Sequence, residues 1–216
     1  MELIPRSLRL YLVTDPNLCP GPALIETVAA AVRGGVSFVQ LRDKEASTQS
    51  RVEAARALKR VLAGKGIPLV INDDLEAAVA ADVDGVHIGQ DDVIPAEARK
   101  RLGPGKIIGL SCETPEQVVS ADPDLADYLG LGTVFQTTTK ADHKPTIGLS
   151  SLAEMARLAR LPTVAIGGLK REHVADVLRA GCNGVAVVSA ICGQPDPERA
   201  AHNLSHALNT TAGLSI

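Results

Sequence analysis

Short apolar runs rich in Val, Ile and Leu alternate along the chain with longer segments rich in Ala, Leu, Arg and Glu. A buried strand of a parallel sheet produces such a short run, and the helix that covers the sheet produces the longer segment. The runs predict eight strands, at residues 8–14, 36–42, 67–72, 85–89, 106–111, 128–132, 163–167 and 184–188. The pattern therefore predicts an α/β fold in which strands and helices alternate.

Helix signals lie between these runs. Apolar residues at three- and four-residue steps predict one helix with a buried stripe. Its members are Val52, Ala55, Leu58 and Leu62. Thr114 and Gln117 have the spacing of a capping box, with Pro115 at the first helical position, so a second helix should begin there.

Eight strand-and-helix units fit either a closed barrel or an open doubly wound sheet. Asp15, Pro16 and Asn17 follow the first run, where an open sheet that binds a dinucleotide would have GxGxxG. We therefore predict a single-domain (β/α)8 TIM barrel over residues 1–216. In such barrels the chemistry lies in the loops that follow the strands.

Composition excludes several other classes of protein. The net charge is −3, aromatic residues make up 2%, and the basic residues are scattered, so we expect no nucleic-acid partner. No apolar stretch is long enough to cross a membrane, and no signal peptide is recognisable. The four cysteines form no CxxC pair, which favours reduced thiols and a cytoplasmic location.

Basic side chains end the second predicted strand. Strand alternation puts Phe38, Gln40 and Arg42 on one face, and Lys44 follows. A guanidinium and an ammonium at one strand end could clamp the oxygens of a diphosphate. A surface salt bridge between Asp43 and Lys44 explains the same residues equally well.

Carboxylates end the third and fourth predicted strands, in Asn72-Asp73-Asp74 and in Asp91-Asp92. Two carboxylates together with diphosphate oxygens suit Mg²⁺. Asp73 and Glu76 also have the spacing of a helix capping box, and for Asp73 alone that is the better interpretation. A basic rim beside two acidic rims favours a metal and phosphate site, although the sequence leaves open whether Asp73 and Asp92 converge.

Histidines have simpler interpretations. His87 lies between apolar neighbours inside the fourth run, which is typical of a hydrogen-bonded residue lining the barrel rather than a ligand. His202 and His206 are spaced i, i+4 on the last helix but lack the glutamate of HExxH, so a solvated helix face is expected.

Two later loops suit an anionic substrate. Thr137, Thr138, Thr139 and Lys140 follow the sixth run, in a polar segment that we interpret as a lid, although such threonines can be structural. Gly168 and the pair Val188-Ser189 follow the seventh and eighth runs, where barrels often bind phosphate on backbone amides. The residues alone thus indicate a barrel enzyme that acts on phosphorylated small molecules.

Four short sequences, in order along nearly the whole chain, resemble the thiamine phosphate synthase family. They are Gln-Leu-Arg-x-Lys at 40–44, Asn-Asp-Asp at 72–74, Gly-Val-His-x-Gly-Gln-x-Asp at 85–92 and Thr-x-Thr-Lys at 137–140. The resemblance implies an enzyme, a transferase that joins a pyrimidine diphosphate to a thiazole phosphate, or to its carboxylated form, and releases pyrophosphate. It also implies that the chain could form a homodimer.

The resemblance further implies roles for individual residues. The residues implied to bind the pyrimidine diphosphate are Gln40, Leu41, Arg42, Asp43, Lys44, Asn72, Ser111 and Lys140. Those implied to bind the thiazole phosphate are Thr137, Thr138, Thr139, Gly168, Val188 and Ser189. Asp73 and Asp92 would ligate Mg²⁺, the implied cofactor, while Arg42, Lys44 and Lys140 would oppose the charge on the departing diphosphate.

Two rival functions share the predicted fold. A related thiazole tautomerase would need neither a diphosphate clamp nor a metal pair, so Lys44, Asp73, Asp92 and Lys140 argue against it. A non-catalytic barrel that binds thiamine intermediates is the other, and the charged positions that the chemistry requires argue against that.

Overall fold

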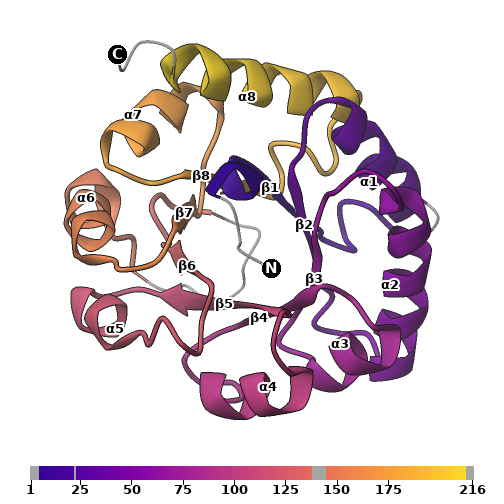
Figure 1. Cartoon of the computed structure of the whole chain (residues 1–216). Helices are drawn as coiled ribbons and strands as arrows, with labels where there is room; N and C mark the ends of the chain where they lie inside the picture. Colours follow the sequence, from indigo (N-terminus) through magenta and orange to yellow (C-terminus); the bar gives the residue numbers. More distant parts are fainter. Residues whose placement is uncertain (1–4, 22, 138–144, 213–216) are drawn as a thin grey trace.

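The computed structural model describes residues 5–21, 23–137 and 145–212, and its eight parallel strands form a closed barrel (Figure 1). Neighbouring strands pair in chain order, and β1 pairs with β8, where Leu12 lies opposite Val187. The strands are β1 (Leu10–Val13), β2 (Phe38–Leu41), β3 (Leu69–Asn72), β4 (Gly85–Ile88), β5 (Ile107–Cys112), β6 (Tyr128–Leu131), β7 (Thr163–Ile166) and β8 (Gly184–Val187). The predicted (β/α)8 barrel is confirmed.

Helices surround the barrel in chain order, and Figure 1 shows them as an outer ring. The helices are α1 (Ala23–Arg33), α2 (Thr48–Leu62), α3 (Leu75–Ala81), α4 (Pro95–Leu102), α5 (Pro115–Ser120), α6 (Gly148–Leu158), α7 (Val174–Arg179) and α8 (Pro197–Ala212), with 3-10 turns η1 (Pro5–Leu8) and η2 (Arg171–His173). The helices cover the outer face of every strand, and the barrel interior covers the inner face. Burial on both faces explains why the strands are continuous apolar runs in the sequence.

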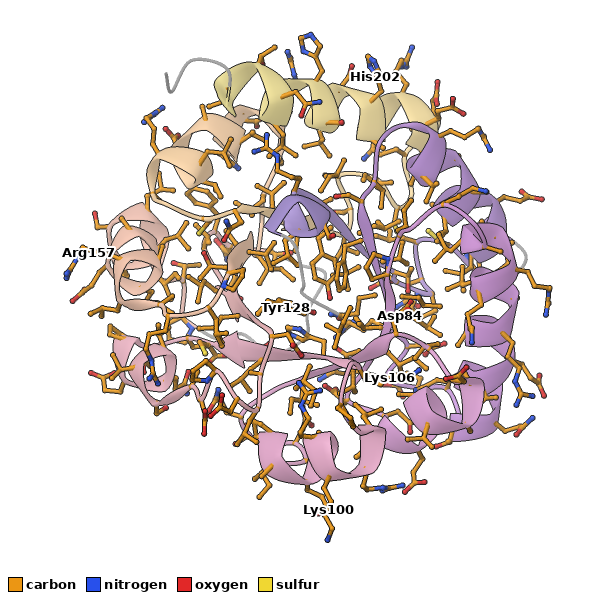
Figure 2. All side chains as sticks on the ribbon, in the orientation of Figure 1. Asp84, Lys100, Lys106, Tyr128, Arg157 and His202 are labelled. Carbon is orange, nitrogen blue, oxygen red and sulfur yellow. The ribbon has the colours of Figure 1, made fainter. Side chains whose placement is uncertain are left out.

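Two apolar clusters hold these layers together. The larger lies between the strands and the helices, and the smaller fills the barrel. The smaller consists of Leu8, Tyr11, Val13, Phe38, Val70, Ile107, Tyr128, Val164 and Ala186. Figure 2 shows Tyr128 within the ring of strands, whereas Lys100 and Arg157 project from the outer helices. Alternation along each strand thus separates the barrel interior from the helix-facing core.

The helix signals in the sequence are confirmed. Helix α2 buries the predicted stripe of Val52, Ala55, Leu58 and Leu62. At the start of α5 the Thr114 side chain accepts a hydrogen bond from the Gln117 backbone, and the Gln117 side chain accepts one from the backbone N–H of Thr114. Local spacing was sufficient here because both signals act within about three helical turns.

The capping interpretation of Asp73 is wrong. Asp74 is the N-cap of α3, and its Oδ1 accepts a 2.8 Å hydrogen bond from the Ala77 N–H. Its Oδ2 forms a 2.7 Å ion pair with Arg51, and both side chains are largely buried. Burial raises the pKa of Asp74, but the Ala77 N–H and Arg51 outweigh it and leave that pKa below its usual value. Asp73 is therefore available for another role.

Cysteines and helix lengths also agree with the sequence. Cys19, Cys112, Cys182 and Cys192 are free thiols, and all four are buried. Among the described residues no helix is both long and apolar enough to cross a membrane.

Replacing Asp74 with Ala should lower the free energy of unfolding by about 2 kcal/mol, since it removes a cap and leaves Arg51 without its carboxylate. Because the folded pKa of Asp74 is depressed, this stabilisation exists above about pH 4 and is lost as the pH falls further. Urea unfolding at pH 7 and pH 3 measures both effects. Asp73→Asn is the matched control. An equal loss of unfolding free energy in the two variants would contradict the assignment of the N-cap to Asp74 rather than Asp73.

Candidate active site

A cavity of about 350 Å³ opens at the carboxyl ends of the strands. Six of the predicted site residues line it, and they are Arg42, Lys44, Asn72, Asp73, Asp92 and Ser111. The other lining residues are His87, Gly89, Gln90, Asp91, Glu113, Gly130, Gly132, Thr133 and Ile166. The loops that follow β2, β3, β4 and β5 thus bring basic and acidic groups to one site.

Asp73 and Asp92 converge in this cavity. The Asp73 N–H donates a 2.9 Å hydrogen bond to the His87 carbonyl, which continues the pairing of β3 with β4. Asp73 has φ of 61°, a left-handed conformation that Asp tolerates better than most residues. Asp92 lies in the loop after β4, where its Oδ2 accepts a 2.7 Å hydrogen bond from the Gly89 N–H. This arrangement brings the two carboxyl groups within hydrogen-bonding range.

The proximity of these carboxyl groups changes their chemistry. Burial is the largest cause that raises the pKa of Asp73, and together with the hydrogen bond and charge of Asp92 it brings that pKa to about 6, while Lys44 opposes the shift. Two crowded carboxylates without a cation repel each other. The pair therefore favours a bound cation or a shared proton.

The donor set fits Mg²⁺. Within the described ranges, no group of three or more His, Cys, Asp or Glu side chains forms a complete metal site. Mg²⁺ does not require one, because it commonly binds one or two carboxylates and completes its shell with substrate phosphates and water. Asp73 and Asp92 supply the two carboxylates, and the adjacent open cavity has room for the other ligands.

The basic residues lie on the neighbouring rim. Arg42 and Lys44 line the cavity, and the Arg42 N–H is bound to Thr14 Oγ1 at 3.0 Å. Arg51 donates to the Asp43 carbonyl at 2.7 Å and to the Lys44 carbonyl at 3.2 Å, so α2 holds this loop in place. These contacts favour the clamp interpretation over an ordinary surface ion pair.

Three neighbours of this clamp lie outside the cavity lining. Leu41 packs between the strands and the helices, as alternation along β2 requires. The Asp43 carboxylate accepts hydrogen bonds from the Glu45 and Ala46 N–H groups. Gln40 is 4% exposed and donates to Tyr11 inside the barrel. Substrate roles for Leu41 and Asp43 would therefore fall to their backbone groups.

A second, smaller cavity lies at the ends of β7 and β8. Thr137, Gly168, Val188 and Ser189 line it, so four of the residues predicted for the thiazole phosphate come together. In the part of the chain that the structure describes, the N–H groups of Gly168 and Ser189 donate to no carbonyl, which leaves them available to an anion. The other predicted residues, Thr138, Thr139 and Lys140, lie outside the described residues.

Known proteins resemble this chain in sequence and fold. The family model described as thiamine monophosphate synthase matches residues 10–191. The chain belongs to the thiamine monophosphate synthase family. The thiamine-phosphate synthase of Xanthobacter autotrophicus is 54% identical over 94% of this chain and 97% of its own, and that of Psychrobacter sp. is 49% identical over 92% and 94%. The structure of thiamine phosphate pyrophosphorylase from Pyrococcus furiosus has a TM-score of 0.87 and 32% identity, covering 96% of this chain and 98% of that one.

Membership of the thiamine monophosphate synthase family confirms the predicted family, and with it the expectation of an enzyme, a transferase of thiamine biosynthesis. The residue roles in this family member stay predictions, because the comparisons match whole chains rather than single side chains. Geometry is the evidence for them.

Three polar residues of the cavity have no role among the sequence predictions, although Asp91 and Gln90 lie in segments named there. Gln90 follows β4, and its Nε2 donates a 2.6 Å hydrogen bond to the Ser111 carbonyl, while Asp91 and Glu113 also line the cavity. Their signal was position, because all three come directly after a strand at the functional end of a barrel. The predicted interpretations of the histidines are confirmed, since His87 is hydrogen-bonded inside the barrel and His202 is exposed on the outer face of α8 (Figure 2).

Asp92→Asn should make the metal-free protein more stable. Asn keeps an acceptor for the Gly89 N–H but removes the charge that faces Asp73. Because the folded pKa of Asp73 is raised to about 6 and an unfolded Asp titrates near about 4, its unfavourable contribution is absent below about pH 4, grows between these two values and is complete above about pH 6. Partial exposure limits the gain to about 1 kcal/mol, or about 2 to 4 °C in Tm, at pH 7.5 in EDTA.

Thermal melts at pH 7.5 and pH 5 test this expectation. The gain should shrink at pH 5, where Asp73 is largely protonated in the parent chain. A variant that melts lower than the parent at pH 7.5, or that gains equally at both pH values, would show that repulsion between these carboxylates does not matter.

Proposed function

We propose that this chain condenses 4-amino-2-methyl-5-hydroxymethylpyrimidine diphosphate with a thiazole phosphate, or its carboxylated form, to give thiamine phosphate and pyrophosphate. One observation carries the proposal: a cavity with paired carboxylates and a basic clamp lies on the same barrel rim as a second cavity, where two backbone N–H groups donate to no carbonyl of the described residues. Two sites that can bind anionic groups in different ways suit two phosphorylated substrates. The relatives from Xanthobacter autotrophicus and Psychrobacter sp. are thiamine-phosphate synthases, which supports the same reaction.

Displacement requires little acid or base catalysis. The thiazole nitrogen has a lone pair that forms the new N–C bond, and the pyrimidine methylene loses its C–O bond as the diphosphate leaves with the electron pair. No proton needs to move for either bond change. The main demand on the protein is to stabilise charge and to hold the two substrates in line.

Arg42 and Lys44 would stabilise the negative charge that grows on the departing diphosphate. Both line the cavity beside the carboxylate pair, and a planar guanidinium can bind two phosphate oxygens at once. Lys140 would add a third cation. Loss of one such donor commonly costs about 3 to 4 kcal/mol of transition-state stabilisation.

Asp73 and Asp92 would hold Mg²⁺. The ion would supply positive charge that offsets the negative charge of the diphosphate. The protein contribution is the geometry of the two carboxylates, with Asp73 held by its backbone hydrogen bond to β4 and Asp92 held by the Gly89 N–H.

Rival functions fit these cavities less well. A thiazole tautomerase would use the second cavity but has no need for Arg42, Lys44 and two converging carboxylates. A cytoplasmic location and a homodimer remain part of the proposal, and the four reduced cysteines support the first.

The decisive experiment mixes the purified chain with the pyrimidine diphosphate, the thiazole phosphate and Mg²⁺, and measures thiamine phosphate and pyrophosphate together. The two products should appear in equal amounts, and EDTA should stop both. Asp92→Ala should abolish most turnover in saturating Mg²⁺, whereas Arg101→Ala, far from the rim on α4, should not. Neither product from the parent chain, or thiamine phosphate without pyrophosphate, would overturn the proposal.

Gly168→Ala should selectively weaken use of the thiazole phosphate. Gly168 has φ of 63°, and an added Cβ would lie 2.6 Å from the Gln136 carbonyl oxygen, so the loop that carries the second cavity must move. We expect KM for the thiazole phosphate to rise at least about tenfold, which corresponds to 1.4 kcal/mol, while KM for the pyrimidine diphosphate stays near the parent value.

Gly64→Ala is the matched control for this measurement. Gly64 also has a left-handed φ, of 73°, but an added Cβ would meet nothing within 4 Å. It should lose similar stability from strain without changing either KM. Equal changes in both KM values for Gly168→Ala would remove the second cavity from thiazole phosphate binding.

A further inference from the structure

A continuous chain of hydrogen bonds crosses the barrel interior beneath the larger cavity. Gln40 Nε2 donates to Tyr11 Oη at 2.7 Å, and Tyr11 Oη lies 2.7 Å from Tyr128 Oη. Tyr128 Oη lies 2.9 Å from His87 Nδ1, and His87 Nε2 lies 2.9 Å from Ser111 Oγ. Five strands contribute one residue each, so the buried Gln40 is connected through the barrel interior to Ser111, which lines the cavity.

Glycines on the strands make room for this chain. A Cβ at Gly109 would lie 2.2 Å from Tyr128 Cζ and 2.4 Å from His87 Nδ1, so any side chain there would separate the two. Barrel interiors are usually filled by bulky branched residues. The absence of a side chain at Gly109 thus creates the space in which His87 and Tyr128 meet.

Burial requires the chain to be complete. Tyr11 and Tyr128 are about 1% and 0% exposed, and an unsatisfied hydroxyl at such a depth costs several kcal/mol. Within the described part of the molecule, no buried side-chain nitrogen or oxygen lacks a partner. Burial raises the pKa of both phenols well above the ordinary value, so each keeps its hydrogen and donates once.

These requirements give the chain a direction. Because the Gln40 amide donates to Tyr11, the single Tyr11 hydrogen goes to Tyr128, and the Tyr128 hydrogen goes to His87 Nδ1. The imidazole hydrogen then lies on Nε2 and is donated to Ser111 Oγ. Among described residues the Ser111 hydroxyl bonds to His87, from which it accepts. The hydroxyl hydrogen of Ser111 can therefore be donated to a ligand in the cavity that Ser111 lines.

We propose that Tyr11, Tyr128 and His87 are positioning residues, which hold the Ser111 hydroxyl as a hydrogen-bond donor toward the pyrimidine diphosphate. The meaning of that donor rests on the proposed function. An acceptor in the cavity, such as an oxygen of the departing diphosphate or a ring nitrogen, would receive a hydrogen bond whose direction is set at Gln40. With the reverse order, Ser111 would donate to His87 and present only lone pairs.

The tautomer of His87 tests the direction without any substrate. In protein labelled with ¹⁵N-histidine, the His87 signals should report a protonated Nε2 and an unprotonated Nδ1. The signals are assigned by their absence in His87→Gln. Tyr128→Phe keeps the ring and removes the hydroxyl, and it should abolish the tautomer preference. A protonated Nδ1 in the parent chain would overturn the proposal, whatever reaction the enzyme catalyses.

A double-mutant cycle tests whether the chain acts through Ser111. Tyr128→Phe alone should lower kcat by about tenfold, the effect commonly seen when the hydrogen-bond partner that orients a binding group is lost, with a smaller change in KM. Added to Ser111→Ala, the same change should have no further effect, because the hydroxyl that it orients is gone. Equal effects in both backgrounds would mean a general structural role and would overturn the proposal.

Two further variants complete the experiment. Phe38→Leu alters the same interior, where Phe38 packs 4.4 Å from the Tyr11 ring centroid, but it removes no polar atom. It should lower Tm and leave the His87 tautomer and kcat unchanged. His87→Gln can still donate to Ser111, so it should retain more activity than His87→Leu. A fall in kcat for Phe38→Leu as large as that for Tyr128→Phe, or equal activities of the two His87 variants, would count against positioning.

Failure of the proposed function would look different. A chain that forms no thiamine phosphate but shows the predicted His87 tautomer would retain the directed hydrogen-bond chain and lose its assigned substrate. A chain that forms thiamine phosphate with unchanged kinetics in Tyr128→Phe would retain the function and lose the inference.

Discussion

Closure of the sheet between β1 and β8 is the constraint on which the site depends. Hydrogen bonds around the full ring force the carboxyl ends of all eight strands to one rim, so loops that are distant in sequence must meet there. Alternation along each strand then decides which side chains face the barrel and which face the helices. Gln40 and Leu41 show the effect, since Gln40 donates to Tyr11 inside the barrel whereas Leu41, the next residue of β2, packs in the cluster that faces the helices.

The architecture could be predicted from the sequence because each strand and helix of the barrel has its own local pattern of apolar residues. Each observed strand lies within its predicted apolar run, except that β5 continues one residue further, to Cys112. The acidic end of β3 was harder. Asp73 and Asp74 are adjacent and chemically identical, and the choice of helix cap depends on the left-handed φ of Asp73, which no local spacing reports. Convergence with Asp92 likewise required the register between β3 and β4.

The acidic pair illustrates how a site is held at some cost to stability. Asp73 adopts a backbone conformation that costs about 1 kcal/mol or more for a residue other than Gly, and its carboxyl faces another carboxyl. The surrounding barrel can hold this arrangement because β3 and β4 are anchored on both faces. Asp74, one residue later, adds a cap and a buried ion pair at the same loop. A carboxylate that stabilises the loop and one that is proposed to bind the metal therefore occupy successive positions.

The polar chain through the barrel links residues that the sequence presents as independent. Gln40 and Ser111 belong to separate sequence segments, yet Tyr11, Tyr128 and His87 connect them. In an apolar interior each hydroxyl must both accept and donate, so a reversal at one link would have to propagate to the others. The orientation of one amide on β2 thereby determines what a hydroxyl on β5 can offer to a ligand. Because the barrel interior excludes water, the buried groups must bond to one another, and this fixes the direction of the hydrogen bond that Ser111 can offer in the cavity.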